Sequence, residues 1–227
     1  MIKSRPKDLV PAFFNNTADS YDKIVSWTTF GNDRVWKNKI LKQLSTEKTV
    51  LDLACGTGIL TRQIAEKIPL AKVTGVDITT SYLEKAREKL NLYQNVSFVN
   101  QDAEKLDLGE KFDCITASYL PKYCEPNILV KNCLEHLNEG GKIILHDFSY
   151  PKNRFVKIIW NFYFCILYLV GFLIPNWKKV FVGLPHLIRE SDWVKEYENT
   201  MKNMGLNVYK QDLTWETSTI IVGTKII

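Results

Sequence analysis

The stretch VLDLACGTG, residues 50–58, decides the fold of this chain. Its first residues form an apolar run typical of a buried strand, and a glycine turn and a helical pattern follow directly. Gly56 and Gly58 carry no side chain, so the backbone N–H groups of the turn can approach a bound ligand closely. The stretch therefore predicts a strand, a turn and a helix that together bind a nucleotide-like cofactor.

Two residues near the turn bear on the kind of cofactor. Turns that bind dinucleotides usually follow the pattern G-x-G-x-x-G, and here the third glycine position is Thr61. Asp52 stands at the strand end, where its charge is a poor neighbour for a pyrophosphate and a good one for an amino or sulfonium group. The pair favours a cationic ligand over a dinucleotide. The alternative is a glycine turn that serves only as the corner between strand and helix.

The pattern D-x-A-C-G-T-G, residues 52–58, resembles motif I of the class I S-adenosylmethionine-dependent methyltransferases. This resemblance implies S-adenosyl-L-methionine as the cofactor. It also implies that Asp52, Ala54, Gly56, Thr57 and Gly58 belong to the cofactor site.

Short apolar segments alternate with amphipathic ones along the chain, which predicts a parallel, doubly wound sheet. We expect strands at residues 49–54, 72–77, 96–99, 112–118 and 142–147, with helices that include 81–92 and 192–204. Two last strands, 207–213 and 219–225, have no helix between them and should form an antiparallel pair. The expected fold is α/β: a Rossmann-like, seven-stranded sheet, mostly parallel with an antiparallel last strand, and with helices on both faces.

Polar residues at the strand ends are further candidates for the cofactor site, because ligands bind outside the carboxyl ends of parallel strands. Asp77 lies 19 residues beyond Gly58, at the spacing expected for a carboxylate that binds ribose hydroxyls. A carboxylate at the start of a helix is the alternative interpretation. By the resemblance, Asp102 and Ala103 contact the adenine amino group and ring. Ile78 and Ser118, at two strand ends, complete the predicted set.

Composition limits the class of protein. A chain of 227 residues with 45% hydrophobic content predicts one domain, 1–227. The net charge of +5 comes from interspersed basic and acidic residues, so no nucleic-acid partner is expected. Five cysteines without C-x-x-C spacing favour a cytoplasmic protein. Three dispersed histidines give no metal site.

Over nearly its whole length the chain resembles the ubiquinone/menaquinone biosynthesis C-methyltransferase family. The similar segments are FNNTADSYDKIVSWTTFGNDRVWK (14–37), FDCITASY (112–119), NEGGKIILHDFSYP (138–151), LPHLIRESDWVKEYENTMKNMGL (184–206) and DLTWETSTIIVGTK (212–225). The resemblance implies cap helices in residues 1–45 that fold over the cofactor, with Tyr21, Arg34 and Lys37 closing its pocket. Without the family, the alternative is that Tyr21, Asp22 and Trp36 simply anchor an N-terminal helix.

The chain departs from this family at two strand ends. After the fourth strand the family usually has Phe-Gly-x-Arg-Asn, whereas this chain has YLPKY at 119–123, and His146-Asp147 stands where Leu-Glu is usual. Carbon methylation of a phenol needs a base that generates phenolate character. We expect His146 to be that base, Tyr119 to orient the acceptor and Lys122 to stabilise phenolate charge. The alternative is that His146 is a structural histidine near a strand end, with its hydrogen bonds satisfied within the protein.

An apolar run, IIWNFYFCILYLVGFLI at 158–174, ends at Pro175 and is shorter than the ~20 residues of a spanning helix. Basic residues flank it on both sides, which suits a helix that lies at a membrane surface. We expect residues 151–190 to form an apolar lid over a lipophilic acceptor, with peripheral membrane contact through 155–180. A buried helix and a spanning helix are the alternatives.

The predicted function is transfer of a methyl group to carbon of a small lipophilic aromatic acceptor, a quinol or phenol precursor. Alternatives are O- or N-methylation of another hydrophobic metabolite or lipid, a nicotinamide oxidoreductase, and a protein that binds S-adenosylmethionine without catalysis. The expected protein is a monomer or homodimer in the cytoplasm, peripheral at the membrane.

Overall fold

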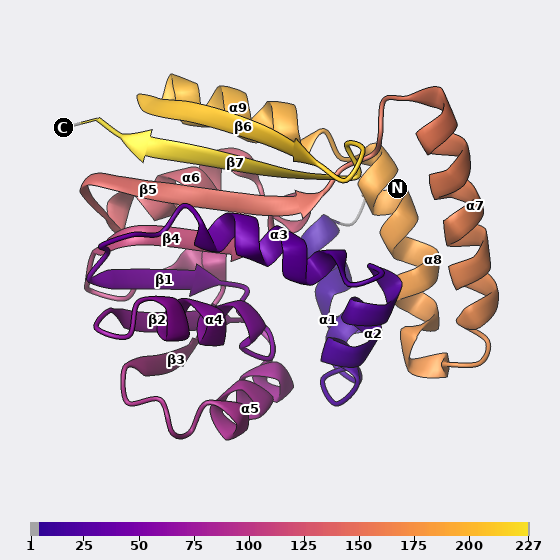
Figure 1. Cartoon of the computed structure of the whole chain (residues 1–227), viewed down its shortest axis with the longest axis horizontal. Coiled ribbons are helices and arrows are strands. Elements are labelled where there is room, and N and C mark those ends of the chain that lie inside the picture. The colour runs from indigo at the N-terminus through magenta and orange to yellow at the C-terminus, as the bar shows by residue number, and fades with distance from the viewer. Residues whose placement is uncertain (1–4, 227) are drawn as a thin grey trace.

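The computed structural model describes residues 5–226, which form a seven-stranded sheet with helices on both faces (Figure 1). The strands are β1 (Thr49–Leu53), β2 (Lys72–Asp77), β3 (Val96–Asn100), β4 (Phe112–Ser118), β5 (Leu137–Phe148), β6 (Leu206–Leu213) and β7 (Ser218–Lys225). Their order across the sheet is β3-β2-β1-β4-β5-β7-β6. All neighbouring strands among the first five pair in parallel. β7 runs antiparallel to both of its neighbours, β5 and β6. The predicted fold is confirmed.

The strand of the opening motif lies in the middle of this sheet. β1 pairs with β2 on one side and with β4 on the other. Val50 packs into the apolar cluster on one face, and Leu51 and Leu53 pack into the cluster on the opposite face. Consecutive side chains are apolar here because both faces of a parallel sheet are covered by helices.

Helices of the two faces come from different parts of the chain. α3 (Asn32–Leu41) and α4 (Ile59–Lys67) lie on one face, with α5 (Thr80–Lys89) beside the start of α4, and α6 (Pro126–Glu135) and α9 (Trp193–Asn203) lie on the other (Figure 1). The fifth strand is longer than predicted, because Phe112 already pairs with Leu137 ahead of a bulge.

The carboxyl ends of the parallel strands are covered by segments from both ends of the chain (Figure 1). These segments are η1 (Pro6–Leu9), α1 (Val10–Phe14), α2 (Tyr21–Thr28), α7 (Arg154–Val170) and α8 (Pro175–Glu190), while η2 (Ala103–Lys105) and η3 (Pro121–Tyr123) follow β3 and β4. α1 packs tightly on α8: a Cβ at Gly183 would stand 2.9 Å from the Cε1 atom of Phe13. The Trp177 Nε1 atom also donates to Ser20 Oγ at 2.8 Å. The N-terminal segment and the α7–α8 hairpin therefore form one cap.

The apolar run at 158–174 differs from the predicted helix. α7 begins earlier, at Arg154, and ends at Val170, after which a turn leads to the separate helix α8. Gly171 allows the two helices to approach, because a Cβ there would lie 3.2 Å from the Lys178 Cα atom. Within residues 5–226, no helix combines the length and the apolar character needed to cross a bilayer.

Candidate active site

The turn after β1 has the backbone conformation that its glycines allow. Ala54, Gly56 and Gly58 all have positive φ angles, of 51°, 58° and 81°. A Cβ at Gly58 would stand 3.1 Å from Leu90 Cδ1 and 3.3 Å from Ala86 Cβ. Gly58 is therefore required for contact between α4 and α5 and for its left-handed backbone, rather than for space beside a ligand as its sequence position suggested.

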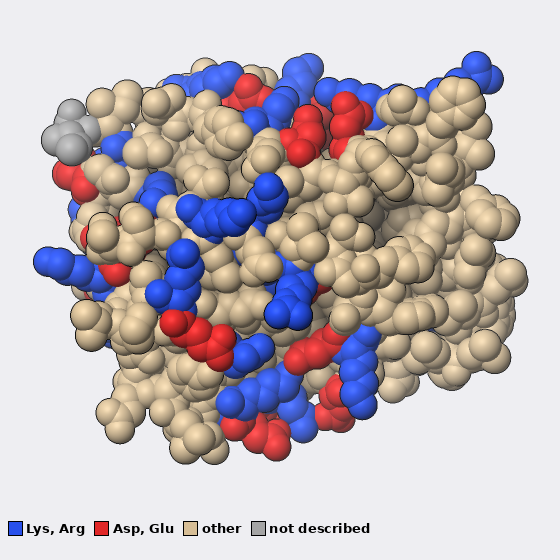
Figure 2. All heavy atoms as spheres, viewed as in Figure 1, with Lys and Arg blue, Asp and Glu red and all other residues tan. Residues whose placement is uncertain are grey.

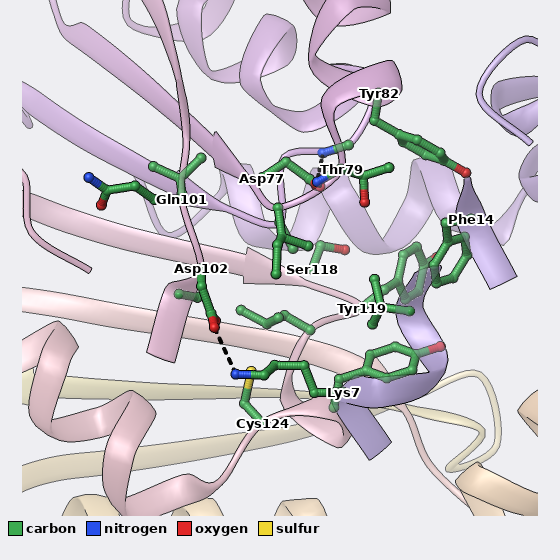
Figure 3. Close-up of a pocket in the computed structure, with 18 of the residues that line it drawn as sticks. Lys7, Phe14, Asp77, Thr79, Tyr82, Gln101, Asp102, Ser118, Tyr119 and Cys124 are labelled. Atoms are coloured by element: carbon green, nitrogen blue, oxygen red, sulfur yellow. Dashed lines mark hydrogen bonds and ion pairs between the residues drawn. The ribbon is translucent and has the colours of Figure 1, made fainter. Parts of the chain in front are cut away.

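A pocket of about 100 Å³ lies at the ends of β1, β2 and β4, and we call it the inner pocket (Figure 3). Asp77 stands in its wall, where its carboxylate accepts hydrogen bonds from the backbone N–H of Gly56 at 2.9 Å and of Thr79 at 2.8 Å. Burial raises the pKa of Asp77 in spite of these bonds. The carboxylate is thus fixed at the edge of the glycine turn.

Asp102 lies across the inner pocket, at the start of η2. Its carboxylate accepts from Lys7 Nζ at 2.7 Å (Figure 3) and from the backbone N–H of Glu104 at 3.0 Å. Lys7 also pairs with the Glu104 carboxylate. Lys7, Val10, Phe14 and Tyr21 belong to the pocket wall. The N-terminal segment therefore closes the inner pocket and is held there by an ion pair between its first helical turn and the loop after β3.

Apart from Asp52, the predicted cofactor residues fall into three groups. Those that line the inner pocket are Tyr21, Ala54, Gly56, Asp77, Ile78, Asp102, Ala103 and Ser118, joined there by Tyr119. Thr57, Gly58 and Arg34 line a separate polar hollow, in which the Thr57 hydroxyl donates to Asp22 at 2.5 Å. Lys37 lines none of these spaces but pairs with Asp33 inside the protein.

Asp52 is placed differently from its prediction. Its side chain is 1% exposed and accepts hydrogen bonds from Thr61 Oγ1 at 2.6 Å and Thr116 Oγ1 at 2.8 Å, and it does not line the inner pocket. Burial raises the pKa of Asp52 to about 6. The Asp52 carboxyl links α4 to β4 beneath the turn. It therefore supports the structure of the inner pocket without being exposed in its wall.

A second space, the apolar cavity, adjoins the inner pocket and has a volume of about 420 Å³. Four aromatic residues line both spaces: Phe14, Tyr21, Tyr119 and Tyr123. The remaining wall comes mainly from α2, α7, α8 and the turn between β6 and β7 and includes Phe30, Trp36, Phe148, Ile159, Trp160, Phe162, Tyr163, Trp177, Phe181 and Trp215. The fold thus places a large apolar space directly against the smaller inner pocket, whose wall also carries the carboxylates of Asp77 and Asp102.

Lys122 is a buried cation in the wall of the apolar cavity. Its Nζ atom lies 2.6 Å from Asp147 Oδ1 and 3.1 Å from the backbone oxygen of Tyr119, and it stands 4.5 Å from the centre of the Tyr123 ring. Burial lowers the pKa of Lys122 and raises that of Asp147. Lys122, predicted to stabilise phenolate charge, therefore lies in the wall of the apolar cavity and is paired there with Asp147.

Tyr119 joins the two spaces. Its hydroxyl donates to Asp33 Oδ1 at 2.8 Å, its ring stacks on Phe148 at 4.8 Å between centres, and its φ of 68° is unusual for a residue with a side chain. Burial and the neighbouring Asp33 carboxylate raise the pKa of Tyr119 well above its ordinary value. Its hydroxyl therefore stays protonated, which suits orientation and excludes proton abstraction.

His146 does not occupy the position expected of a base. The ring is fully buried, its Nδ1 lies 2.9 Å from Ser118 Oγ and its Nε2 lies 2.8 Å from Ser218 Oγ. Burial lowers the pKa of His146 well below its ordinary value, and it lines neither the inner pocket nor the apolar cavity. Both nitrogens are engaged by serine hydroxyls, one of them that of the inner-pocket residue Ser118, and the ring itself reaches neither space, so the geometry favours the alternative, a histidine that holds β4, β5 and β7 together.

Several site residues carry no recognisable sequence signal. Lys7 lies far from Asp102 in the chain, whereas Asp33 precedes Lys37 by one helical turn, a spacing that could have predicted their ion pair. Tyr123 is 6% exposed, and its hydroxyl has no hydrogen-bond partner among the described residues although it lies in the wall common to both spaces. An unpaired buried hydroxyl is costly, which indicates a partner that arrives with a ligand.

Comparison with known proteins adds independent findings. The model of the ubiE/COQ5 methyltransferase family matches residues 2–225. A demethylmenaquinone methyltransferase from Porphyromonas gingivalis is 29% identical in an alignment 226 residues long, which covers 95% of this chain and 92% of that protein. A ubiquinone/menaquinone biosynthesis C-methyltransferase from Pseudomonas aeruginosa is 32% identical and covers 82% of this chain and 77% of its own length.

Solved structures show the same fold at low identity. Phosphoethanolamine N-methyltransferase 2 from Haemonchus contortus has a TM-score of 0.69 and 15% identity, covering 100% of this chain and 61% of its own. The YcgJ protein from Bacillus subtilis has a TM-score of 0.61 and 18% identity, covering 84% of this chain and 98% of its own.

Proposed function

Because the chain belongs to the ubiE/COQ5 methyltransferase family and is an S-adenosyl-L-methionine-dependent methyltransferase, we propose that it methylates a ring carbon of a lipophilic quinol or phenol. The observation that carries the proposal is the common wall of the inner pocket and the apolar cavity, formed by Phe14, Tyr21, Tyr119 and Tyr123. A methyl donor in the first space and an aromatic acceptor in the second would meet at this wall. The names of the relatives supply the quinol class.

The residues of the inner pocket fit the cofactor. Asp77 and Asp102 offer carboxylate oxygens to ribose hydroxyls and to an adenine amino group, and small Ala103 leaves room for a flat ring. The unpartnered hydroxyl of Tyr123 gives a further polar contact. When bound, S-adenosyl-L-methionine would supply a methyl group already activated by its sulfonium charge, and transfer of that group to a ring carbon would release the demethylated cofactor and one proton. The protein therefore has to align the acceptor and exclude water.

The apolar cavity suits a lipophilic aromatic ring and its tail, since rings and aliphatic side chains make up most of its wall. Lys122 is the cation within reach of such a ring and is the group we assign to phenolate stabilisation. Its charge is balanced by Asp147 at 2.6 Å, so the pair can remain ionised although it is buried. Tyr119, held by Asp33, orients the acceptor at the common wall.

The proposal is tested with S-adenosylmethionine that carries a deuterated methyl group and a set of reduced, short-tailed acceptors. The set contains a demethylated naphthoquinol, a benzoquinol and a simple phenol. Mass spectrometry and carbon NMR then identify the methylated atom, and a product with the label on a ring carbon supports the proposal. A label found only on oxygen or nitrogen, or binding of the cofactor without any product, overturns it.

Lys122 has a matched control in this experiment. Lys122→Met keeps the length of the side chain and removes its charge, and turnover should fall by at least tenfold while cofactor affinity stays within threefold. Lys131→Met makes the same change at an exposed residue of α6, with a side chain 71% exposed, and should behave as the wild type.

A further inference from the structure

One face of α7 exposes a continuous row of large apolar side chains. The residues are Phe155, Ile158, Phe162, Ile166 and Leu169 of the helix and Leu173 in the turn that follows it; they are spaced three or four apart and between 43% and 82% exposed, and we call them the α7 face. In Figure 2 the surface over α7, at the right of the view, is almost wholly uncharged. An apolar patch of this kind on a water-soluble surface marks a binding site.

The opposite side of the same helix is already packed. Trp160 and Leu167 are buried and line the apolar cavity inside the protein. α7 is thus apolar on both sides, a pattern found where one side meets protein and the other meets a second apolar phase. Its 17 residues are too few to span a bilayer, so the helix lies along a surface.

The charge of the α7–α8 hairpin indicates what that surface is. Residues 151–190 contain six Lys and Arg residues and one acidic residue, Glu190, at the end of α8. Lys152 and Arg154 stand at one end of α7, and Lys178 and Lys179 stand near the other end, at the start of α8; all four are exposed. Cations at both ends of an exposed apolar stripe complement the anionic headgroups and apolar interior of a lipid bilayer.

The α7 face is continuous with the apolar cavity. Ile159, Phe162 and Ile166 line the cavity and are 61%, 67% and 43% exposed, so they form part of its mouth. Phe30 and Trp215 line the cavity from the opposite side and are also largely exposed. Figure 2 shows the surface hollowed beside this region. The mouth therefore opens beside the α7 face.

We infer that the α7 face docks on an anionic lipid bilayer and opens the apolar cavity to the lipid phase, so that an acceptor dissolved in the membrane enters without crossing water. The inference rests on the proposed function for the identity of that acceptor. Docking itself requires only the exposed stripe, the basic ends and the adjoining mouth.

The test uses sedimentation of the full chain with vesicles of phosphatidylcholine alone or mixed with phosphatidylglycerol. Binding to the mixed vesicles, weakened at high salt, is expected. The variant Ile158→Asp/Leu169→Asp alters two exposed residues of α7 that do not line the cavity and should bind at least tenfold more weakly. Leu70→Asp/Leu92→Asp changes two residues that are 99% and 88% exposed elsewhere and should bind as the wild type.

Activity separates this inference from the proposed function. With a short-tailed, water-soluble acceptor, Ile158→Asp/Leu169→Asp should retain wild-type turnover, which also verifies its folding. With a long-tailed acceptor embedded in mixed vesicles, its turnover should fall by at least tenfold.

Absence of wild-type binding to mixed vesicles overturns docking whatever the activity. So does a dimer in lipid-free solution that the α7 variant dissociates, because a second copy would then cover the face. Failure to methylate any soluble acceptor, with vesicle binding intact, removes the proposed function and leaves the docking surface.

Discussion

The buried carboxyl of Asp52 makes the stability of the protein depend on pH in a way that can be calculated. Its pKa of about 6 in the folded chain exceeds the ordinary value of 3.8, and the difference corresponds to about 3 kcal/mol at 1.36 kcal/mol per unit. Below about pH 4 both states are protonated. Between pH 4 and pH 6 the unfolded chain ionises first. The stability that the protonated Asp52 carboxyl contributes to the folded state is therefore fully present below about pH 4 and is lost as the pH rises through 6.

Asp52→Asn removes the ionisation and keeps an oxygen that can accept from Thr61 or Thr116. The free energy of unfolding of the variant minus that of the wild type should rise by about 2 to 3 kcal/mol between about pH 4 and pH 7.5. Urea unfolding followed by circular dichroism at several pH values measures it. If the free energy of unfolding depended on pH in the same way in the variant and in the wild type, the buried placement of this carboxyl would be refuted. Cofactor affinity at pH 7.5 should change by less than threefold, since Asp52 does not line the inner pocket.

Three further perturbations test the site. Asp77→Asn should weaken S-adenosylmethionine binding by about 10- to 100-fold in calorimetric titration, because hydrogen bonds to a charged acceptor contribute about 1.5–3 kcal/mol, while exposed Asp107→Asn should have no effect. His146→Gln should lower the melting temperature yet keep kcat within threefold; a fall of 10² or more without loss of stability would restore it as a general base. Lys7→Ala removes the ion pairs to Asp102 and Glu104 and should speed cofactor dissociation about tenfold in stopped-flow measurements, and an unchanged rate would contradict the closing role of the N-terminal segment.

The fold could be predicted from the sequence because its signals are local. The apolar run, glycine turn and helix of residues 50–58 follow one another in the chain, and each strand end after them can be located by its own pattern. Asp77 and Asp102 were found in this way, since the ends of parallel strands share one edge of the sheet.

Orientation across the sheet could not be predicted. His146 and Asp147 are neighbours at the end of β5, and alternate side chains of a strand point to opposite faces. The sequence does not tell which of these two side chains points toward the acceptor. In the structure it is Asp147 that pairs with Lys122. Contacts between distant segments, such as Lys7 with Asp102, leave no trace in either segment alone.

The wall of aromatic rings between the inner pocket and the apolar cavity has a kinetic consequence. Phe14 and Tyr21 belong to the N-terminal segment that closes the inner pocket, and the same two residues complete the apolar cavity. When that segment opens to admit the cofactor, the acceptor loses part of its binding surface. Turnover should therefore follow a compulsory order, in which the methyl donor binds before the acceptor and the demethylated cofactor leaves after the product.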